Sequence, residues 1–187
     1  MKAMILEKIG NLLENKKPLT LVEMTRPAPY GDDLLVKVSA CGDCHTELDE
    51  IEGRTPPSTL PMIPGHQVVG QVHELGPDAH RYKPGDRVGI AWIFSACGAC
   101  RFCREGYENL CRDVQATGRD AHGGYAEYML VSERFVYGIP DFFSDREAAP
   151  LLCAGAIGYR SMQLTQLVDG QRLGLTGFGA SAHLVMK

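Results

Sequence analysis

Residues 97–111 read CGACRFCREGYENLC, and this stretch decides much of the fold because four cysteines fall within it. They are Cys97, Cys100, Cys103 and Cys111. A Cys-x-x-Cys turn aims two sulfurs at one ion, a third follows three residues later, and the fourth returns after a short loop. Four thiolates are typical of a structural zinc, which orders a loop that lacks its own hydrophobic core. An iron–sulfur cluster, two disulfides or four free thiols are the alternatives.

The composition excludes several classes of protein. The chain has 187 residues, of which 44% are hydrophobic and 22% charged, with a net charge of −4, as in an average globular protein. It has no run of Lys and Arg and no apolar run of roughly 20 residues, so we expect neither nucleic acid nor a membrane as partner. Residues 1–7 lack the apolar centre of a signal peptide, which predicts a cytoplasmic protein.

Short apolar or alternating segments, separated by Pro and Gly, surround the cysteine stretch. We expect strands at residues 3–7, 19–23, 34–40, 67–75 and 87–92. Four prolines in residues 56–64 mark a loop, and PGD at 84–86 marks a turn. This pattern predicts a mainly β fold, either a barrel or a sandwich.

The sequence becomes more helical after about residue 143. Ser144 followed by Glu147 is typical of a capping box, so we expect a helix that continues through residue 152. A second helix is expected over residues 154–167. A strand at 171–176 and a helix from residue 180 to the end of the chain complete the expected elements.

Further candidate metal ligands are scattered along the chain. Cys44, His66 and Cys153 are suitable ligands, but their spacing follows no metal-binding pattern. Taken alone, His66 is more often a structural histidine. Cys153 lies in the apolar segment PLLCAG, where a cysteine usually acts as a small buried hydrophobe. The spacing therefore does not establish a second metal site.

Four segments taken together resemble one family. They are CGDCHTEL at 41–48, PGH at 64–66, the cysteine stretch at 97–111 and LCAG at 152–155. In order and interval they are similar to the zinc-dependent medium-chain alcohol dehydrogenases over the whole chain. The resemblance implies a GroES-like, partly open β-barrel over residues 1–153, the catalytic domain. It also implies a zinc lobe at residues 93–113.

The resemblance implies a catalytic zinc held by Cys44, His66 and Cys153, with a fourth position open to water or alcohol. A zinc ion there lowers the pKa of an alcohol, which then passes a hydride to NAD or NADP. His45 and Thr46 match residues that contact the cofactor pyrophosphate and pass on the alcohol proton. The implied protein is an oxidoreductase.

Two other positions near this site are expected to have different roles. Trp92 matches a position that lines the substrate pocket, where a large ring favours small primary alcohols. The alternative for Trp92 is an aromatic core residue at the end of a strand. Cys41 matches no ligand position, so we expect it in the core.

Three positions depart from the family pattern. Glu47 stands where the family usually has an Asp that orients the zinc histidine, and its extra methylene alters the geometry of a hydrogen bond to His66. Gln67 replaces the Glu of a Gly-His-Glu motif, which removes a negative charge. Asp49 replaces a histidine of the proton relay and is a weak base at neutral pH.

The C-terminal residues resemble the start of a Rossmann domain. GFGASA at 177–182 fits the turn that brings a pyrophosphate to a helix N-terminus, so Gly177, Gly179 and Ala182 are candidate cofactor-binding residues. Family chains run to nearly twice this length. We therefore expect residues 154–187 to be a linker helix and a truncated strand–turn–helix stub, without the acidic residue that reads the ribose. Its unpaired strand is expected to be mobile or to pack on a second copy in a homo-oligomer.

Two hypotheses of function follow. The first is a zinc-dependent alcohol dehydrogenase that acts on a small primary alcohol or aldehyde with NAD or NADP. The second is a non-redox zinc-binding domain that binds no dinucleotide and serves as an interaction module. Weak hydrolysis by zinc-bound water is a variant of the second. Binding of NAD separates the two hypotheses.

Overall fold

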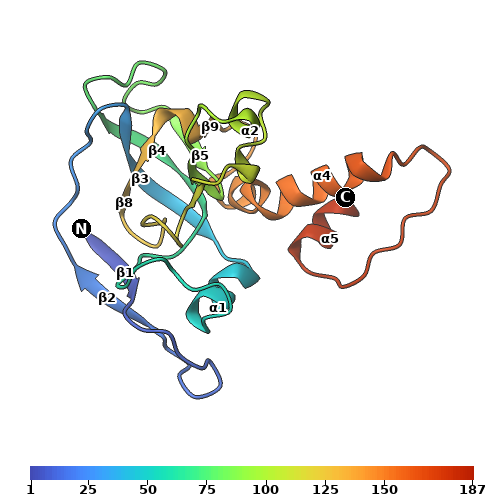
Figure 1. Cartoon of the computed structure of the whole chain (residues 1–187), viewed down its shortest axis with the longest axis horizontal. Helices are drawn as coiled ribbons and strands as arrows, with labels where there is room; N and C mark the ends of the chain where they lie inside the picture. The colour runs from blue at the N-terminus through green and yellow to red at the C-terminus, as the bar shows by residue number, and fades with distance from the viewer.

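The computed structural model describes residues 1–187 as a β-rich body from which a helical arm extends (Figure 1). The strands are β1 (Lys2–Leu6), β2 (Leu19–Glu23), β3 (Asp33–Gly42), β4 (Gln67–Leu75), β5 (Arg87–Ile90), β6 (Ile93–Ser95), β7 (Gln115–Ala116), β8 (Tyr128–Ser132) and β9 (Val136–Gly138). The α-helices are α1 (His45–Ile51), α2 (Arg101–Arg104), α3 (Asp145–Ala148), α4 (Ala154–Thr165) and α5 (Ala180–Val185). Three 3₁₀ turns are η1 (Glu108–Leu110), η2 (Glu133–Phe135) and η3 (Ala149–Leu152). The expected mainly β fold is confirmed.

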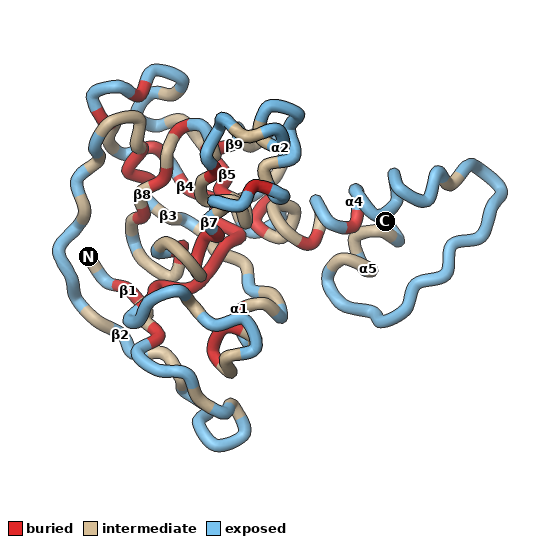
Figure 2. The backbone as a smooth tube through the Cα atoms, in the orientation of Figure 1, coloured by how far each residue is buried: buried red, intermediate tan, exposed pale blue.

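The centre of the body is a five-stranded antiparallel sheet in the order β8-β3-β4-β5-β9. Its edge strands β8 and β9 do not pair with each other, so the sheet stays open, as expected of a partly open barrel. Every second side chain of these strands points into the same core, which accounts for the alternating pattern of apolar residues in the sequence. This core contains Leu34, Val36, Val68, Val88 and Ile90. Figure 2 shows buried backbone concentrated along these strands.

Two smaller strand pairs flank the sheet. The antiparallel pair β1–β2 closes one side of the body, and the pair β6–β7 carries the four-cysteine lobe. At the base of the lobe the Ser95 hydroxyl donates to the Gln115 side-chain oxygen at 2.7 Å. Neither α2 nor η1, the helical turns of the lobe, buries a residue. The lobe therefore lacks a hydrophobic core of its own.

The capping box at Ser144 is present, but the helix it starts is shorter than expected. The Ser144 hydroxyl accepts from the Glu147 N–H, and the Glu147 carboxylate accepts from the Ser144 N–H at 2.9 Å. The chain then changes to the 3₁₀ turn η3 at Ala149, because Pro150 has no N–H to continue the α-helical pattern. Ala148 and Ala149 pack against Val69 of β4, which anchors this segment to the sheet.

The C-terminal arm consists of α4, a long loop and α5, which packs back on α4 (Figure 1). Gly158 of α4 permits this approach, because an added Cβ would lie 2.8 Å from the Val185 side chain. The expected strand at 171–176 is wrong: no other strand lies beside these residues to supply its hydrogen bonds. Helix α5 ends at Val185 and not at Lys187. Whether the arm is mobile or packs on a second copy stays a prediction, as does the domain division at residue 153.

None of the helices is both long enough and apolar enough to span a membrane.

Candidate metal centre and adjoining pockets

The register of β3 and β4 brings Cys44 and His66 together. Gly42, the last residue of β3, lies opposite Gln67, the first residue of β4. Because antiparallel partners run in opposite directions, Cys44 leaves the sheet where His66 enters it. The Cys44 sulfur lies 3.6 Å from His66 Nε2. Residues that are 22 positions apart in the sequence thus become neighbours.

Cys153 reaches the same place from the C-terminal part of the chain, because it directly follows η3, which packs on β4. The ligand atoms of Cys44, His66 and Cys153 all lie within 4.8 Å of one another. In a tetrahedron with Zn–S of about 2.3 Å and Zn–N of about 2.0–2.1 Å, neighbouring sulfur and nitrogen ligands lie about 3.6 Å apart. The separation of the Cys44 and His66 ligand atoms matches this geometry.

The turn before His66 depends on Gly65. Its φ is +97°, a conformation that side chains with a Cβ rarely adopt. A Cβ on Gly65 would also lie 2.6 Å from the Tyr125 ring and 2.8 Å from the Cys41 sulfur. Cys41 itself is outside the metal cluster, and burial raises the pKa of its thiol to about 12.

Glu47 connects the two halves of the centre. One oxygen of its carboxylate accepts the Cys44 N–H at 2.8 Å, which caps α1, and the other lies 2.7 Å from His66 Nδ1. His66 therefore points Nε2 toward the cysteines while Nδ1 faces a carboxylate, the arrangement that holds metal-binding histidines in place. The expected contact between Glu47 and His66 is present in spite of the extra methylene.

The charges of the centre favour a thiolate at Cys44 and protons on its neighbours His66 and Cys153. Hydrogen bonds from the Cys153 thiol and from His66 lower the pKa of Cys44 to about 3, against the opposing effect of burial. Burial opposes protonation of His66, but its hydrogen bonds to Cys44 and Glu47 outweigh it and raise the pKa to about 9. The Cys44 thiolate raises the pKa of Cys153. A bound cation replaces these shared protons.

We predict that Glu47→Ala weakens zinc binding at this centre by about 10- to 100-fold, because His66 loses the carboxylate that orients its ring. The measurement is competition with a chromogenic chelator, which resolves the weaker of the zinc sites. Glu14→Ala is the matched control, because Glu14 is exposed and far from Glu47 in the sequence. It should leave the zinc affinity unchanged. An unchanged affinity in Glu47→Ala would contradict the role of this contact.

The residues expected to carry a proton lie on the first turns of α1. Thr46 donates its N–H to the Cys44 sulfur at 3.3 Å, and its side chain lines the pocket that contains His66. His45 is largely exposed, and its Nε2 lies 3.7 Å from Asp49 Oδ1. Asp49 also pairs with Arg54. His45 is thus exposed on the same helix as Thr46, and the Asp49 side chain is partly buried.

Two buried polar groups beside the centre have no partner. Both oxygens of Glu50 and the Gln67 amide nitrogen are buried without a hydrogen bond. Burial, followed by the charge of Glu47, raises the pKa of Glu50 to about 7. Sequence analysis missed Glu50, because a carboxylate on a short helix is usually exposed.

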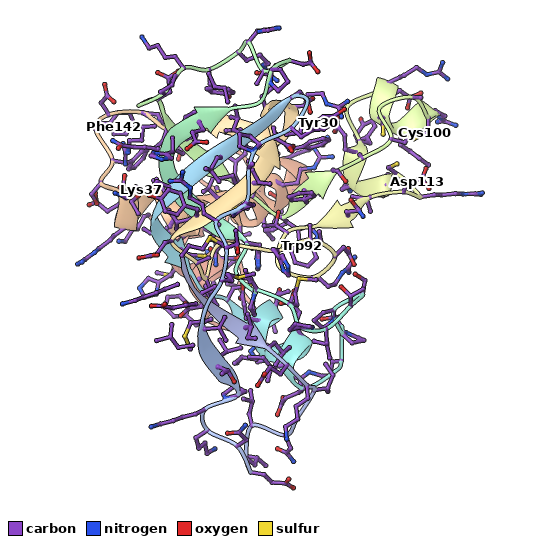
Figure 3. All side chains as sticks on the ribbon, turned by 90° about the vertical axis from the view of Figure 1, so that its left-hand side faces the viewer. Tyr30, Lys37, Trp92, Cys100, Asp113 and Phe142 are labelled. Atoms are coloured by element: carbon purple, nitrogen blue, oxygen red, sulfur yellow. The ribbon has the colours of Figure 1, made fainter.

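The four-cysteine lobe forms the second cluster. The ligand atoms of Cys97, Cys100, Cys103 and Cys111 lie within 4.8 Å of one another, and all seven cysteines of the chain are free. The Cys103 sulfur lies 3.5 Å from that of Cys100 and 3.8 Å from that of Cys97, close to the separation of about 3.8 Å in a zinc–thiolate tetrahedron. The backbone N–H groups of Ala99 and Cys100 lower the pKa of Cys97 to about 6. Figure 3 shows Cys100 at the outer end of this lobe.

Two pockets meet at the first cluster. The larger, of about 810 Å³, is lined on one side by Thr46, His66, Trp92 and Cys153. The Trp92 ring packs edge-on against His66, with 4.9 Å between ring centroids, so this aromatic residue forms a wall next to the metal ligands. Trp92 follows β5 and lies near the middle of the molecule in the view of Figure 3.

The second pocket, of about 460 Å³, contains the glycine-rich turn. It is lined by Cys44, His45 and Cys153 together with Gly177, Gly179 and Ala182. The candidate cofactor-binding residues thus lie opposite the ligand cysteines, although they are more than 130 positions away from Cys44. The positive φ of Gly177, +80°, shapes the turn.

Comparison with known proteins gives the chain a family. The model of the alcohol dehydrogenase GroES-like domain matches residues 30–141, which includes the central sheet, α1 and the four-cysteine lobe. The chain belongs to this family. A curated relative, the probable alcohol dehydrogenase AdhA of Mycobacterium tuberculosis, is 50% identical over 172 residues, which are 89% of this chain and 50% of the relative. The chain spans about half the length of the curated relatives it matches.

Solved structures of the family share its fold. A cinnamyl alcohol dehydrogenase of Sorghum bicolor superposes with a TM-score of 0.87 at 31% identity, over 100% of this chain and 54% of that one. A thermostable alcohol dehydrogenase of Pyrobaculum aerophilum with bound cobalt and zinc gives 0.89 at 26% identity, over 99% and 55%. The CAD protein of Helicobacter pylori complexed with NADP(H) gives 0.86 at 26% identity, over 98% and 54%.

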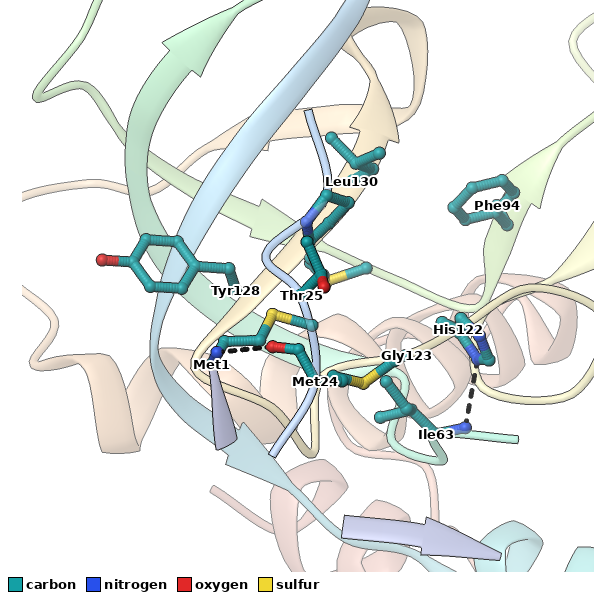
Figure 4. Close-up of a pocket in the computed structure, with 11 residues that line it drawn as sticks. Met1, Met24, Thr25, Ile63, Phe94, His122, Gly123, Tyr128 and Leu130 are labelled. Atoms are coloured by element: carbon teal, nitrogen blue, oxygen red, sulfur yellow. Dashed lines mark hydrogen bonds between the residues drawn. The ribbon is translucent and has the colours of Figure 1, made fainter. Parts of the chain in front are cut away.

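A third cavity of this GroES-like chain lies apart from both clusters (Figure 4). It measures about 230 Å³ and is mostly apolar, with Met1, Met24, Phe94 and His122 in its wall. His122 Nδ1 accepts a hydrogen bond from the Ile63 N–H at 3.2 Å, so this side chain satisfies a backbone donor. None of the candidate ligands lines the cavity.

Sequence analysis missed the outer wall of the larger pocket. The wall combines residues of the four-cysteine lobe, of β9 and of α4; they are Tyr107, Asn109, Leu110, Tyr137, Ile157 and Arg160. The positions 153, 156, 157 and 160 follow the helical period, so the signal was present once Cys153 had been placed. The contributions of the lobe and of β9 depend on tertiary contacts.

Proposed function

We propose that this chain is the zinc-binding catalytic part of an alcohol dehydrogenase, which transfers a hydride between a primary alcohol or aldehyde and NAD or NADP. The observation that carries the proposal is the position of one metal cluster between two pockets. Thr46, His66 and Trp92 face a substrate-sized pocket, whereas Cys44 and His45 face the glycine-rich turn. Pockets of a few hundred Å³ are typical of small-molecule sites.

In this proposal Cys44, His66 and Cys153 hold the catalytic zinc, and the four lobe cysteines hold a structural zinc. The first set has three ligands and borders a pocket, which leaves a position for substrate, whereas the second set has four. The chemistry that zinc supplies at the first site is a positive charge, which favours loss of a proton from an alcohol. Glu47 keeps His66 in its orientation throughout.

The remaining residues position the substrate and move the proton. The Thr46 hydroxyl both accepts and donates, so it takes the alcohol proton in the pocket, and His45 with Asp49 leads toward solvent. The Trp92 ring next to His66 leaves little space for a second substituent on the reacting carbon of an alcohol. This favours primary alcohols, including small ones, over secondary alcohols. The pocket is roomy beyond Trp92, so we extend the proposal to aromatic primary alcohols such as benzyl alcohol.

The cofactor side of the proposal uses the glycine-rich turn. Gly177, Gly179 and Ala182 line the second pocket with His45, so a pyrophosphate bound in it would meet the glycine-rich turn and a histidine. The helix behind the turn, α5, packs on α4, whose first residue follows Cys153. The glycine-rich turn is therefore connected to one metal ligand, Cys153, through the packing of α5 on α4.

We predict saturable binding of NAD⁺ or NADP⁺ to the zinc-loaded 187-residue chain in a calorimetric titration. Gly177→Val should abolish this binding, because a β-branched side chain does not adopt its φ of +80° and would fill the pocket. Gly170→Val is the matched control: Gly170 also has a positive φ, +84°, but lies outside the pocket. Absorbance at 340 nm then follows oxidation of benzyl alcohol and ethanol.

The opposite result would favour the second hypothesis. If neither dinucleotide binds at millimolar concentration while both metal clusters are filled, the chain is a non-redox zinc-binding domain. Equal loss of binding in the two glycine variants would instead show that the arm unfolds, and would remove the turn from the proposal.

A further inference from the structure

The larger pocket has one charged residue in its outer wall. Of the side chains that line it, Arg160 alone carries a permanent charge, and no acidic residue lines it. The rest of the outer wall is aromatic or aliphatic, with the hydroxyls of Tyr107 and Tyr137 and the amide of Asn109 as its polar groups. A ligand in this pocket therefore meets the metal ligands at one end and a positive charge at the other.

Arg160 is held toward the pocket by its helix. Cys153 precedes α4, and Ala156, Ile157 and Arg160 follow it at helical spacing, so these residues share one face. Seven residues of helix correspond to a rise of about 10 Å. Cys153 and Arg160 are thus separated by about 10 Å along the helix axis, so a ligand that contacts both is longer than ethanol, as a para-substituted benzyl alcohol is.

The guanidinium has no partner within the chain. It forms no hydrogen bond, ion pair or stacking contact, whereas Arg87, Arg119 and Arg134 each pair with an aspartate. The neighbouring Tyr107, Asn109 and Tyr137 side chains also form no hydrogen bond. Arg160, Tyr107, Asn109 and Tyr137 are thus four solvent-exposed polar side chains that line the pocket and have no partner within the chain. A carboxylate matches them, because a guanidinium presents paired N–H donors and the tyrosine and amide groups donate as well.

We propose that Arg160 determines substrate specificity by binding an anionic group at the end of the substrate that is remote from the alcohol. The substrate class is a primary alcohol, or its aldehyde, whose aromatic or similarly long tail ends in a carboxylate. This inference rests on the proposed function, since it takes the larger pocket as the substrate pocket.

Trp92 provides the measurement, because it is the single tryptophan of the chain and lines this pocket. We would titrate the zinc-loaded chain with 4-(hydroxymethyl)benzoate, benzyl alcohol and 4-(aminomethyl)benzyl alcohol and follow tryptophan fluorescence. The carboxylate compound should bind about tenfold more tightly than benzyl alcohol, because one partly exposed charge-assisted contact contributes about that much. The amine should bind more weakly than benzyl alcohol. Added salt should reduce the preference.

Arg160→Gln should remove the preference, so that the carboxylate compound binds no more tightly than benzyl alcohol. Arg172→Gln is the matched control, because Arg172 is an exposed, unpaired arginine of the same arm outside the pocket. A preference that survives in Arg160→Gln would mean that the carboxylate binds the zinc ion instead, and would overturn the proposal. Equal affinities for all three compounds, or no binding of the carboxylate at millimolar concentration, would also overturn it.

The test separates this inference from the proposed function. Oxidation of benzyl alcohol without a carboxylate preference would leave the dehydrogenase proposal intact and reject the role of Arg160. A carboxylate preference that depends on Arg160, in a chain that binds neither NAD⁺ nor NADP⁺, would support the anion site and reject the dehydrogenase.

Discussion

Cys44→Ser is expected to remove one of the two proposed zinc ions and to slow the proposed alcohol oxidation about 10³-fold or more. The thiolate of Cys44 is the centre of the cluster: its sulfur accepts the Thr46 N–H and lies 3.6 Å from His66 Nε2. A serine hydroxyl is shorter and remains protonated at neutral pH, so it is a poor zinc ligand. Loss of a charge worth several kcal/mol in the transition state corresponds to the stated factor.

The measurement combines zinc content by atomic emission with the rate at 340 nm. Cys41→Ala is the matched control, since Cys41 lies three residues away but its buried thiol stays outside the cluster. Cys41→Ala should retain both zinc ions, whereas Cys44→Ser should retain only the ion in the lobe. Retention of two zinc ions in Cys44→Ser would remove the residue from the proposed ligand set.

Cys103→Ser is expected to unfold the four-cysteine lobe and to lower the melting temperature by about 8 °C or more. The Cys103 sulfur contacts two other sulfurs of the cluster, and α2 and η1 bury no side chain that could order the lobe without a metal ion. Loss of a structural metal belongs to the changes that cost more than about 4 kcal/mol, and each kcal/mol shifts a domain of this size by about 2–4 °C.

The loss of order in the lobe should also weaken substrate binding. Gly106, Tyr107, Asn109 and Leu110 of the lobe line the larger pocket, so we expect weaker binding of benzyl alcohol along with the lower melting temperature. Hydrogen exchange should show lost protection across residues 97–111 in Cys103→Ser and native protection in Arg101→Gln, which alters an exposed ion pair of the same lobe. A lobe that stays protected after the loss of Cys103 would exclude a structural role for its metal.

The sequence alone predicts the elements whose stability is local. The Ser144–Glu147 capping box forms as predicted, because its hydrogen bonds join residues three positions apart. The strands at 19–23 and 67–75 have the predicted bounds. The four lobe cysteines converge as their spacing predicts.

The segment at 171–176 shows why apolar pattern was not enough. It has the composition of a strand, yet a strand needs hydrogen bonds from a neighbour, and none of the strands within residues 1–187 lies beside it. The helical pattern up to residue 152 changes for a different reason, the missing N–H of Pro150, which was visible in the sequence.

The sequence by itself determined the ligand types, the capping box, the strand pattern and the resemblance to a family. The spacing of Cys44 and His66 left open whether they meet, and only the family resemblance implied that they do. Tertiary structure shows how: the β3–β4 register brings them together, and Glu47 lies 2.7 Å from His66 Nδ1. It also decided that the lobe, β9 and α4 enclose one pocket with Arg160 at its far end. Hydrogen bonds such as those of the capping box join residues close in sequence, so the local sequence specifies them. A pocket forms only when segments that are distant in the chain pack together.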